Sequence, residues 1–419
     1  IKLDLPLKMD IYGTYKNLLI ISIAQEWLGF PVGSLLAVEI EDALKGNIVS
    51  NSIKMLFKPS ETSFLRNVSI GSDQILVNVL DNIKGKIIQF EKIGKTWFES
   101  NIKGFDEDML SVAGSDNWSN RSFLESESFT QPTGLYFSEN SKEYKKIKSL
   151  PQKFDPKKYE VEQFFSESKD GTKIPYFQIS RKDMIANSKN PTLLYGYGGF
   201  EISLTPSYLS AFTTKWIDDG GVYVIANIRG GGEYGPKWHQ SALKANRQRA
   251  YDDFISVAEE LIEREVTSPR NLGIRGGSNG GLLVGAVFTQ RPDLFNAVIC
   301  AVPLLDMYRY DKLLAGASWV DEYGDPDNED EWEYIQKYSP YQNVFSNQDY
   351  PEVYFYTSTK DDRVHPGHAR KMAKKMLDQG HEVIYYENVE GGHSAASNYE
   401  QSAFMSSLQL EYLIDKLKN

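Results

Sequence analysis

The sequence contains a single cysteine, Cys300, so no disulfide can form within the chain. Cys300 lies in the apolar run 297–302, which predicts a buried strand and a packed thiol. No apolar run reaches the ~18 residues of a membrane-spanning helix, so the sequence predicts no membrane span. Basic residues are outnumbered, 46 against 57 acidic ones, and the net charge of −11 argues against nucleic acid as a partner.

Signals for a metal or a cofactor are also missing. No group of cysteines and histidines has the spacing of a zinc site. The acidic run 321–333 lacks the glycine that an EF-hand loop needs at its sixth position, so we interpret it as a solvated loop. Residues 230–235 fit the Gly-x-Gly-x-x-Gly pattern of a dinucleotide site, but Pro236 and Trp238 stand where the phosphate-binding helix should begin. We therefore expect neither a metal nor a cofactor.

The chain has 419 residues, which is enough for two domains. Short apolar runs separated by turns fill its first part, at 17–22, 33–39, 74–80 and 86–90. The last two flank the turn 81–85 and predict a hairpin in an all-β meander. This spacing is typical of propeller blades, which repeat every ~40–50 residues, or of a β-sandwich.

After residue 150 the character of the sequence changes. Two prolines and several charges in 150–158 indicate a linker. Beyond it, strand-like runs alternate with helical ones, which predicts a parallel sheet covered by helices on both faces. We expect the strands at 192–195, 222–227, 271–275, 297–302, 352–357 and 382–386. We expect the helices at 207–218, 251–265, 282–288 and 369–379, followed by a terminal helix.

Residues 276–281, Gly-Gly-Ser-Asn-Gly-Gly, join one expected strand to the helix that follows. This is the setting of a Gly-x-Ser-x-Gly nucleophile elbow, in which a serine stands at the apex of a sharp turn. Its neighbours must be small so that the hydroxyl is accessible, and the following helix directs its N–H groups and positive dipole end at the reacting centre. We interpret Ser278 as a nucleophile and this region as an α/β-hydrolase domain.

A nucleophilic serine needs a base, and this fold orders its catalytic residues as serine, acid and histidine. Of the five histidines, His239 precedes the serine and His381 begins a strand. His365 and His368 begin a helix, and they lie too close to the preceding strand to leave room for a further β-α unit. His393 lies in a small-residue loop after the last strand, so we predict that it is the base.

The acid should follow the strand before the last one, where Asp361 and Asp362 are adjacent. One of them must accept the imidazole N–H and fix its tautomer. The other would be a turn or N-cap group. The spacing alone does not choose between them.

Five blocks in the same order resemble the prolyl oligopeptidase family of serine peptidases: 195–200, 226–235, 276–281, 291–295 and 361–364. The resemblance extends from about residue 165 to the end of the chain and is weak before that. It implies a β-propeller ahead of an α/β-hydrolase domain, and hydrolysis of short peptides after proline through an acyl-enzyme. It also implies that Asp361, rather than its neighbour, is the acid that acts with Ser278 and His393.

The resemblance further implies which residues bind the substrate. The Tyr197 hydroxyl and the Asn279 backbone N–H would form the oxyanion hole, and Tyr197 does follow the first strand of this region. Arg363 would donate a hydrogen bond to a substrate carbonyl. The proline pocket would be built from four apolar or aromatic side chains: Phe200, Trp319, Tyr323 and Val364.

We therefore expect propeller blades at 1–150 and the catalytic domain at 151–419. About 150 residues make only ~3 blades, whereas propellers need four or more, so we expect a longer gene product with further blades ahead of Ile1. The completed propeller would admit only short, flexible peptides. We expect a monomer, located in the cytoplasm or, alternatively, in the periplasm.

Two other functions fit parts of the sequence. The acidic Asp321 and Glu322 near the pocket would suit a sister oligopeptidase that cuts after arginine or lysine. An inactive scaffold that binds partners is the third interpretation. The presence of the serine, the acid, the base and both oxyanion donors argues against it.

Overall fold

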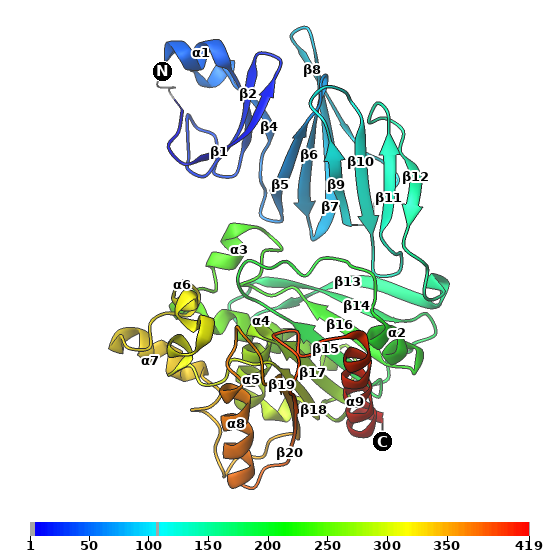
Figure 1. The fold of residues 1–419 in the computed structure, drawn as a ribbon, viewed down its shortest axis with the longest axis vertical. Coiled ribbons are helices and arrows are strands. Elements are labelled where there is room, and N and C mark those ends of the chain that lie inside the picture. Colours follow the sequence, from blue (N-terminus) through cyan, green and yellow to red (C-terminus); the bar gives the residue numbers. More distant parts are fainter. Residues whose placement is uncertain (1–4, 106–108, 419) are drawn as a thin grey trace. The chain divides into compact units, whose positions relative to one another are not determined.

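The computed structural model describes residues 5–105 and 109–418, which form two compact units (Figure 1). The first unit contains the described residues up to Pro156 together with 205–209 and 233–235. The second unit contains the other described residues. The division at Pro156 falls inside the segment 150–158 that the sequence marks as a linker.

Within the described residues, the first unit forms three antiparallel meanders, each pairing strands that follow one another along the chain. A single parallel residue pair, Gly85 with Met109, joins the second meander to the third. Four-stranded antiparallel meanders are the repeating units of a propeller. The strands are β1 (Met9–Tyr15), β2 (Leu18–Ile23), β3 (Leu35–Glu39), β4 (Lys54–Phe57), β5 (Ser63–Ile70), β6 (Gln74–Asp81), β7 (Lys84–Ile93), β8 (Thr96–Asn101), β9 (Met109–Ser115), β10 (Ser122–Glu127), β11 (Gly134–Ser138) and β12 (Lys145–Ser149).

Strand β6 shows how these meanders pack on one another. Its side chains alternate between the two faces of the sheet, and all but the last are buried. Ile75 and Val77 share a core with Ile20 of the first meander, whereas Leu76 packs with Leu124 of the third. The second meander is therefore covered on both faces, as a propeller blade is and as a sheet in a two-sheet sandwich is not.

The second unit is built on a mixed sheet with the strand order β13-β14-β16-β15-β17-β18-β19-β20. Strands β15 to β20 run parallel, whereas β13 and β14 form an antiparallel hairpin that continues on β16. The strands are β13 (Tyr159–Glu167), β14 (Lys173–Arg181), β15 (Thr192–Gly196), β16 (Val222–Ala226), β17 (Leu272–Gly277), β18 (Ala297–Ala301), β19 (Val353–Ser358) and β20 (Val383–Asn388).

The strands predicted to form a parallel sheet do so, but the sequence analysis missed the antiparallel hairpin at one end. Strand β13 lies at an edge of the sheet, and many of its side chains are exposed. Its sequence, Tyr-Glu-Val-Glu-Gln-Phe-Phe-Ser-Glu, has no continuous apolar run of the kind that marks a central strand.

Helices cover both faces of this sheet, as predicted. Successive side chains of β17 point to opposite faces: Ile274 packs in one core with Leu283 of α5, and Arg275 donates a hydrogen bond of 3.0 Å to Gln409 of α9. The main helices are α2 (Ala211–Asp218), α4 (Gln248–Glu263), α5 (Asn279–Gln290), α8 (Gly367–Asp378) and α9 (Tyr399–Lys418). The shorter ones are α1 (Ile40–Lys45) in the first unit and α3 (Pro236–Gln240), α6 (Val320–Tyr323) and α7 (Glu329–Tyr338) in the second.

Some helix boundaries differ from those expected. Helix α2 begins only at Ala211, because the Ser210 hydroxyl caps it by accepting a hydrogen bond of 3.2 Å from the Thr213 N–H. Helix α3 does begin at Pro236, contrary to our reading of that proline, because proline suits the first turn of a helix.

The lone thiol is sealed in the core of the sheet. Cys300 is fully buried in β18, and burial raises the pKa of its thiol well above the usual value. This confirms the prediction of a packed cysteine.

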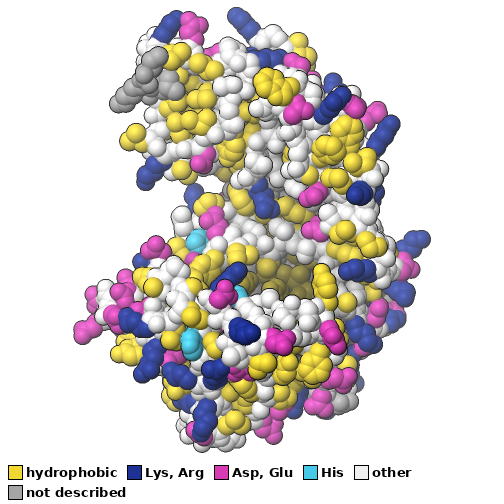
Figure 2. Space-filling view, viewed as in Figure 1, with side chains coloured by type: hydrophobic (Ala, Val, Ile, Leu, Met, Phe, Trp, Pro, Cys, Tyr) yellow, Lys and Arg dark blue, Asp and Glu magenta, His cyan; other side chains and the backbone are white. Residues whose placement is uncertain are grey.

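Within the part of the chain that the structure describes, no helix has both the length and the hydropathy to cross a bilayer. Acidic and basic side chains are interspersed on the face that Figure 2 shows.

His368, at the start of α8, anchors the segment that follows β18. Its Nδ1 accepts hydrogen bonds from the backbone N–H groups of Leu305 (3.3 Å) and Asp306 (3.1 Å). Both bonds require a neutral Nδ1. Burial is the largest influence on this imidazole and lowers its pKa from 6.5 to about 4.

This histidine should make the second unit acid-sensitive. Below its ordinary pKa the unfolded chain takes up a proton that the folded chain excludes, so stability is complete above pH 6.5 and is lost as the pH falls towards 4. We expect a loss of about 2–3 kcal/mol between about pH 7 and about pH 4.5 from this group alone. Urea unfolding of His368→Asn should show a correspondingly weaker pH dependence. The surface variant His381→Asn is the control, and equal pH dependence in all three proteins would contradict the assignment.

Candidate active site

The predicted strand, turn and helix are all present around Ser278. Strand β17 ends at Gly277 and α5 begins at Asn279. Between them Ser278 has φ 60° and ψ −118°. Residues other than glycine rarely adopt this backbone conformation, because it is strained. A Cβ on Gly276 would lie 2.0 Å from the Gly280 carbonyl oxygen, so the turn closes only because this position is a glycine.

His393 and Asp361 are in direct contact. The imidazole Nδ1 lies 2.8 and 2.9 Å from the two carboxylate oxygens of Asp361. Asp361 is buried and also accepts hydrogen bonds from the backbone N–H groups of Arg363 (2.9 Å) and Val364 (3.0 Å). Asp362, which the spacing left as an alternative, is exposed. The structure therefore brings Asp361, and not Asp362, to the imidazole.

The sheet explains why these three residues are candidates for one site. Ser278 follows β17, Asp361 follows β19 and His393 follows β20. The three strands belong to the parallel part of the sheet, so their carboxyl ends lie at the same edge. The carboxylate can only accept a hydrogen, which places the imidazole hydrogen on Nδ1 and leaves Nε2 able to accept one.

Tyr197 reaches the same place from the loop after β15. Its phenol interacts with the side chain of Ser278. Burial raises the pKa of the phenol, and the interaction with Ser278 opposes that effect only in part, so the group stays protonated at neutral pH. The Asn279 N–H opens helix α5, where N–H groups have no partner within the helix. A hydroxyl donor and a backbone donor thus lie next to Ser278.

The residues predicted for the pocket form an aromatic cluster. The Phe200 ring meets Trp319 and Tyr323 edge to face, at centroid distances of 6.4 and 5.8 Å. Tyr323 and Val364 are buried, whereas Phe200 and Trp319 are half-buried. Trp319 ends a 3-10 helix, Leu314–Trp319.

Arg363, the predicted partner of a substrate carbonyl, has an exposed side chain. Its backbone carbonyl accepts a hydrogen bond of 3.3 Å from the Ala315 N–H, which ties it to the segment that carries Trp319. Arg363 follows the acid Asp361 by two residues in the sequence. In the structure its backbone contacts the pocket segment.

Charged side chains are buried behind this cluster, and no sequence pattern indicated their burial. The Glu322 carboxylate is buried and contacts Arg247 (3.0 Å) and His239 (2.7 Å). Arg247 is itself buried. In the sequence Arg247 stands among several polar residues, and nothing distinguishes it from an arginine exposed to solvent. Asp321, the other acid near the pocket, is exposed.

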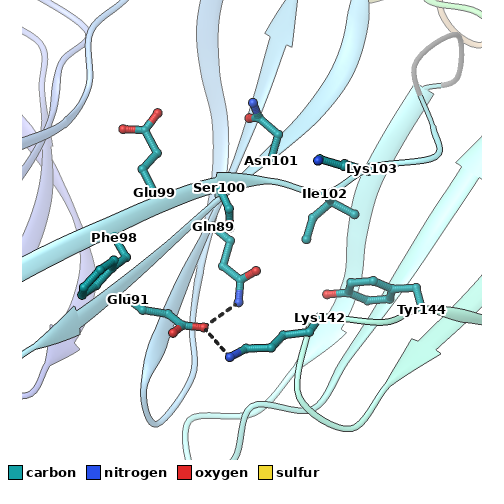
Figure 3. A pocket seen from close by; sticks show the side chains of 10 residues that line it. All are labelled: Gln89, Glu91, Phe98, Glu99, Ser100, Asn101, Ile102, Lys103, Lys142 and Tyr144. Atoms are coloured by element: carbon teal, nitrogen blue, oxygen red, sulfur yellow. Dashed lines mark hydrogen bonds and ion pairs between the residues drawn. The ribbon is translucent and has the colours of Figure 1, made fainter.

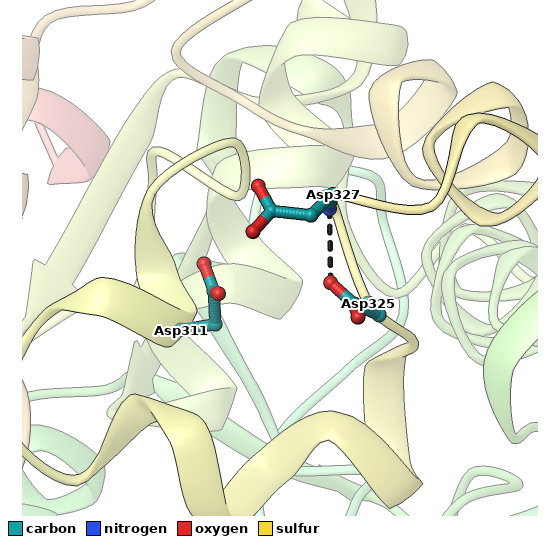
Figure 4. Close-up of side chains that lie close together, drawn as sticks. All are labelled: Asp311, Asp325 and Asp327. Carbon is teal, nitrogen blue, oxygen red and sulfur yellow. Dashed lines mark hydrogen bonds between the residues drawn. The ribbon is translucent and has the colours of Figure 1, made fainter.

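An acidic cluster elsewhere in the second unit has the ligand types of a cation site. Asp311, Asp325 and Asp327 place one carboxylate oxygen each within 4.8 Å of one another (Figure 4). Lys312 forms ion pairs with Asp311 and Asp327, so one ammonium group already bridges two of the three carboxylates. Asp327 also donates its backbone N–H to Asp325 at 2.9 Å. The cluster therefore has a sufficient explanation as a lysine-bridged turn.

A cavity of about 510 Å³ lies in the first unit, and both polar and apolar side chains line it (Figure 3). Strands β7 and β8 and the loop between β11 and β12 line it. Glu91 spans it by accepting a hydrogen bond of 3.3 Å from Gln89 and by pairing with Lys142 at 3.6 Å. None of the predicted site residues lines it.

Comparison with known proteins identifies the family of the chain. Residues 207–419 match the model of the prolyl oligopeptidase family. An uncharacterised peptidase, y4nA, from Sinorhizobium fredii is 42% identical over 99% of this chain and 58% of its own length. The prolyl endopeptidase of Elizabethkingia miricola is 36% identical over 82% of this chain and 49% of its own length. The chain thus spans about half the length of such relatives.

The solved structures include a post-proline cleaving enzyme from Rickettsia typhi. It superimposes with a TM-score of 0.87 and 35% identity, covering 99% of this chain and 61% of that one. The similarity extends over both units and confirms the predicted fold class, propeller blades followed by an α/β-hydrolase domain. Together with the match of the family model, it shows that the chain belongs to the prolyl oligopeptidase family of serine peptidases.

Proposed function

We propose that this chain carries the catalytic machinery of a serine endopeptidase that hydrolyses short peptides on the carboxyl side of proline. One observation carries the proposal. A strained serine stands at the start of a helix and interacts with the Tyr197 phenol, at the sheet edge where a histidine contacts a buried aspartate. The relatives described as prolyl endopeptidases support the choice of substrate.

The mechanism is acyl transfer. Ser278 attacks the carbonyl carbon of a proline while the His393 Nε2 takes the serine proton, and Asp361 holds the imidazole in the tautomer that allows this. The Tyr197 hydroxyl and the Asn279 N–H stabilise the oxyanion of the tetrahedral intermediate. His393 then gives its proton to the leaving amine, and water hydrolyses the acyl-enzyme by the same steps in reverse. The chemistry needs no cofactor.

Specificity for proline would come from the aromatic cluster. A pyrrolidine ring is compact and apolar, and Phe200, Trp319 and Tyr323 offer ring faces and edges to it. Val364 closes the pocket on the side of the acid, and Arg363 binds a substrate carbonyl.

The alternative of cleavage after arginine or lysine needs an acid that is free to bind a basic side chain. Glu322 does not offer one, since Arg247 and His239 already occupy its carboxylate. Only the exposed Asp321 remains to support that alternative. As further parts of the proposal, residues 1–150 are blades of a propeller, residues 151–419 are the catalytic domain, and the enzyme is a monomer of the cytoplasm or the periplasm.

Replacing the nucleophile tests the proposed function. Ser278→Ala should lower peptide turnover by ~10⁴–10⁶-fold, because the group that forms the acyl-enzyme is lost. It should also abolish labelling by a fluorophosphonate. Ser407→Ala, which removes an exposed hydroxyl from α9, is the matched control and should keep both. Turnover above a few per cent in Ser278→Ala would remove the serine from this role, and an unlabelled wild-type enzyme would support the inactive scaffold.

Replacing the indole tests the specificity. Trp319→Ala should weaken transition-state binding of proline substrates by ~1–3 kcal/mol through the loss of apolar contact. The kcat/KM values for matched proline and alanine peptides give the measurement, and the ratio between them should fall. Trp332→Ala, a half-buried tryptophan of α7 in the same unit, should leave the ratio unchanged. An equal loss on both substrates in Trp319→Ala would make this tryptophan structural.

A further inference from the structure

One buried amide joins the proposed oxyanion donor to the wall of the proposed pocket. We propose that the side chain of Asn279 is a positioning group that fixes the Tyr197 hydroxyl against Ser278, and that Arg247 holds this amide in place. The inference rests on the proposed role of Tyr197. It gives a function to side-chain groups that touch neither the substrate nor the reacting atoms.

The hydrogen bonds of Asn279 determine how its amide is oriented. Its Nδ2 donates to the backbone carbonyl of Tyr197 at 2.6 Å. Its Oδ1 accepts from the Arg247 guanidinium at 2.6 Å and from the Tyr323 hydroxyl at 2.7 Å. Because arginine can only donate, the oxygen must face it and the nitrogen must face the Tyr197 carbonyl. The amide therefore fastens the residue whose hydroxyl reaches Ser278.

Close packing leaves the amide no other position. Asn279 is 1% exposed. A Cβ on Gly199 would lie 2.5 Å from its Nδ2, so the loop approaches the amide only because a glycine stands there. The loop carrying Tyr197 is thus pressed onto the side chain that holds it, and a shift of the amide would displace the phenol.

Arg247 extends the same clamp to the other end of the loop. Its second amino group donates to the Glu322 carboxylate at 3.0 Å, and the same carboxylate oxygen accepts the Phe200 N–H at 3.0 Å. One guanidinium therefore binds both the Asn279 amide, which holds the Tyr197 carbonyl, and the Glu322 carboxylate, which holds the Phe200 N–H. Burial opposes its charge, yet Tyr251, Tyr323 and Glu322 keep the pKa of Arg247 above its usual value, so the clamp stays ionised.

An isosteric change separates positioning from general stability. Asn279→Asp keeps the shape, the backbone N–H and the acceptor for Arg247 and Tyr323, but it turns an oxygen towards the Tyr197 carbonyl. We expect kcat to fall by about 10²-fold, because a displacement of ~1 Å in a catalytic group costs that much. KM should change by less than about 3-fold, because the lost interaction acts on the transition state.

A double-mutant cycle with Tyr197→Phe provides the decisive readout. If Asn279 acts through the Tyr197 hydroxyl, Asn279→Asp should cost less than about 3-fold once that hydroxyl is gone. Losses that multiply in both backgrounds, or an unchanged kcat in a folded Asn279→Asp enzyme, would overturn the proposal. Gln290→Glu makes the same amide-to-acid change at the far end of α5 and should leave kcat unaltered.

Arg247→Lys tests the second half of the inference. A lysine keeps the charge but cannot span both acceptors as a guanidinium fork does. We expect a loss of about 10-fold in kcat that is again small in the Tyr197→Phe background. A loss that is not coupled to Tyr197 would remove Arg247 from the clamp.

Failure of this inference can be told apart from failure of the proposed function. The cycle uses whichever peptide or ester the wild-type enzyme turns over, so a different substrate preference does not affect it. An enzyme that turns over none and is not labelled by a fluorophosphonate contradicts the proposed function and the inference together. A labelled, active enzyme with a multiplicative cycle contradicts the inference alone.

Discussion

The sharp turn at Ser278 is the constraint on which the rest of the second unit depends. The serine backbone is strained, so neighbouring segments have to hold it. They do so at very short range: a Cβ on Gly280 would lie 2.9 Å from the Gly196 carbonyl at the end of β15. This approach of α5 to the end of β15 brings the loop that carries Tyr197 against the serine. Strand, helix and loop are thus placed by one turn that glycine alone permits.

Buried charges are arranged so that the site can stay rigid. Arg247 and Glu322 lie in the interior, where an unpaired charge would be costly, and each finds several partners. Donors that are already oriented need not reorganise when negative charge develops on a substrate. The buried polar groups next to the pocket therefore hold other side chains in place and take no part in the reaction themselves.

Residue spacing and chain order predicted the features of this molecule that depend on neighbouring residues or on the order of elements. The glycine and serine spacing at 276–281 identified the elbow, and the order of residues along an α/β-hydrolase singled out His393. Spacing could not choose between Asp361 and Asp362, because the difference lies in burial and in contact with the imidazole. The role of Asn279 beyond its backbone was invisible for the same reason. Its partners come from segments far apart in sequence, and only folding brings them together.

Strand β13 escaped prediction because an edge strand needs few apolar residues, so its sequence resembles a polar loop. Strand β14 is buried and largely apolar, yet the prediction missed it as well. In the first unit the short apolar runs were enough to predict a meander, but not to choose between a propeller and a sandwich. That choice depends on what covers the second face of β6, which is set by strands many residues away.

The isolation of Cys300 has a practical consequence. Because the lone sulfhydryl lies deep in β18, this chain should behave towards alkylating dyes as a cysteine-free background does while it is folded. If one cysteine were introduced on the surface of each unit, such dyes would label these two residues and not Cys300. Fluorescence between the two labels would then report in solution the distance that separates the two labelled positions.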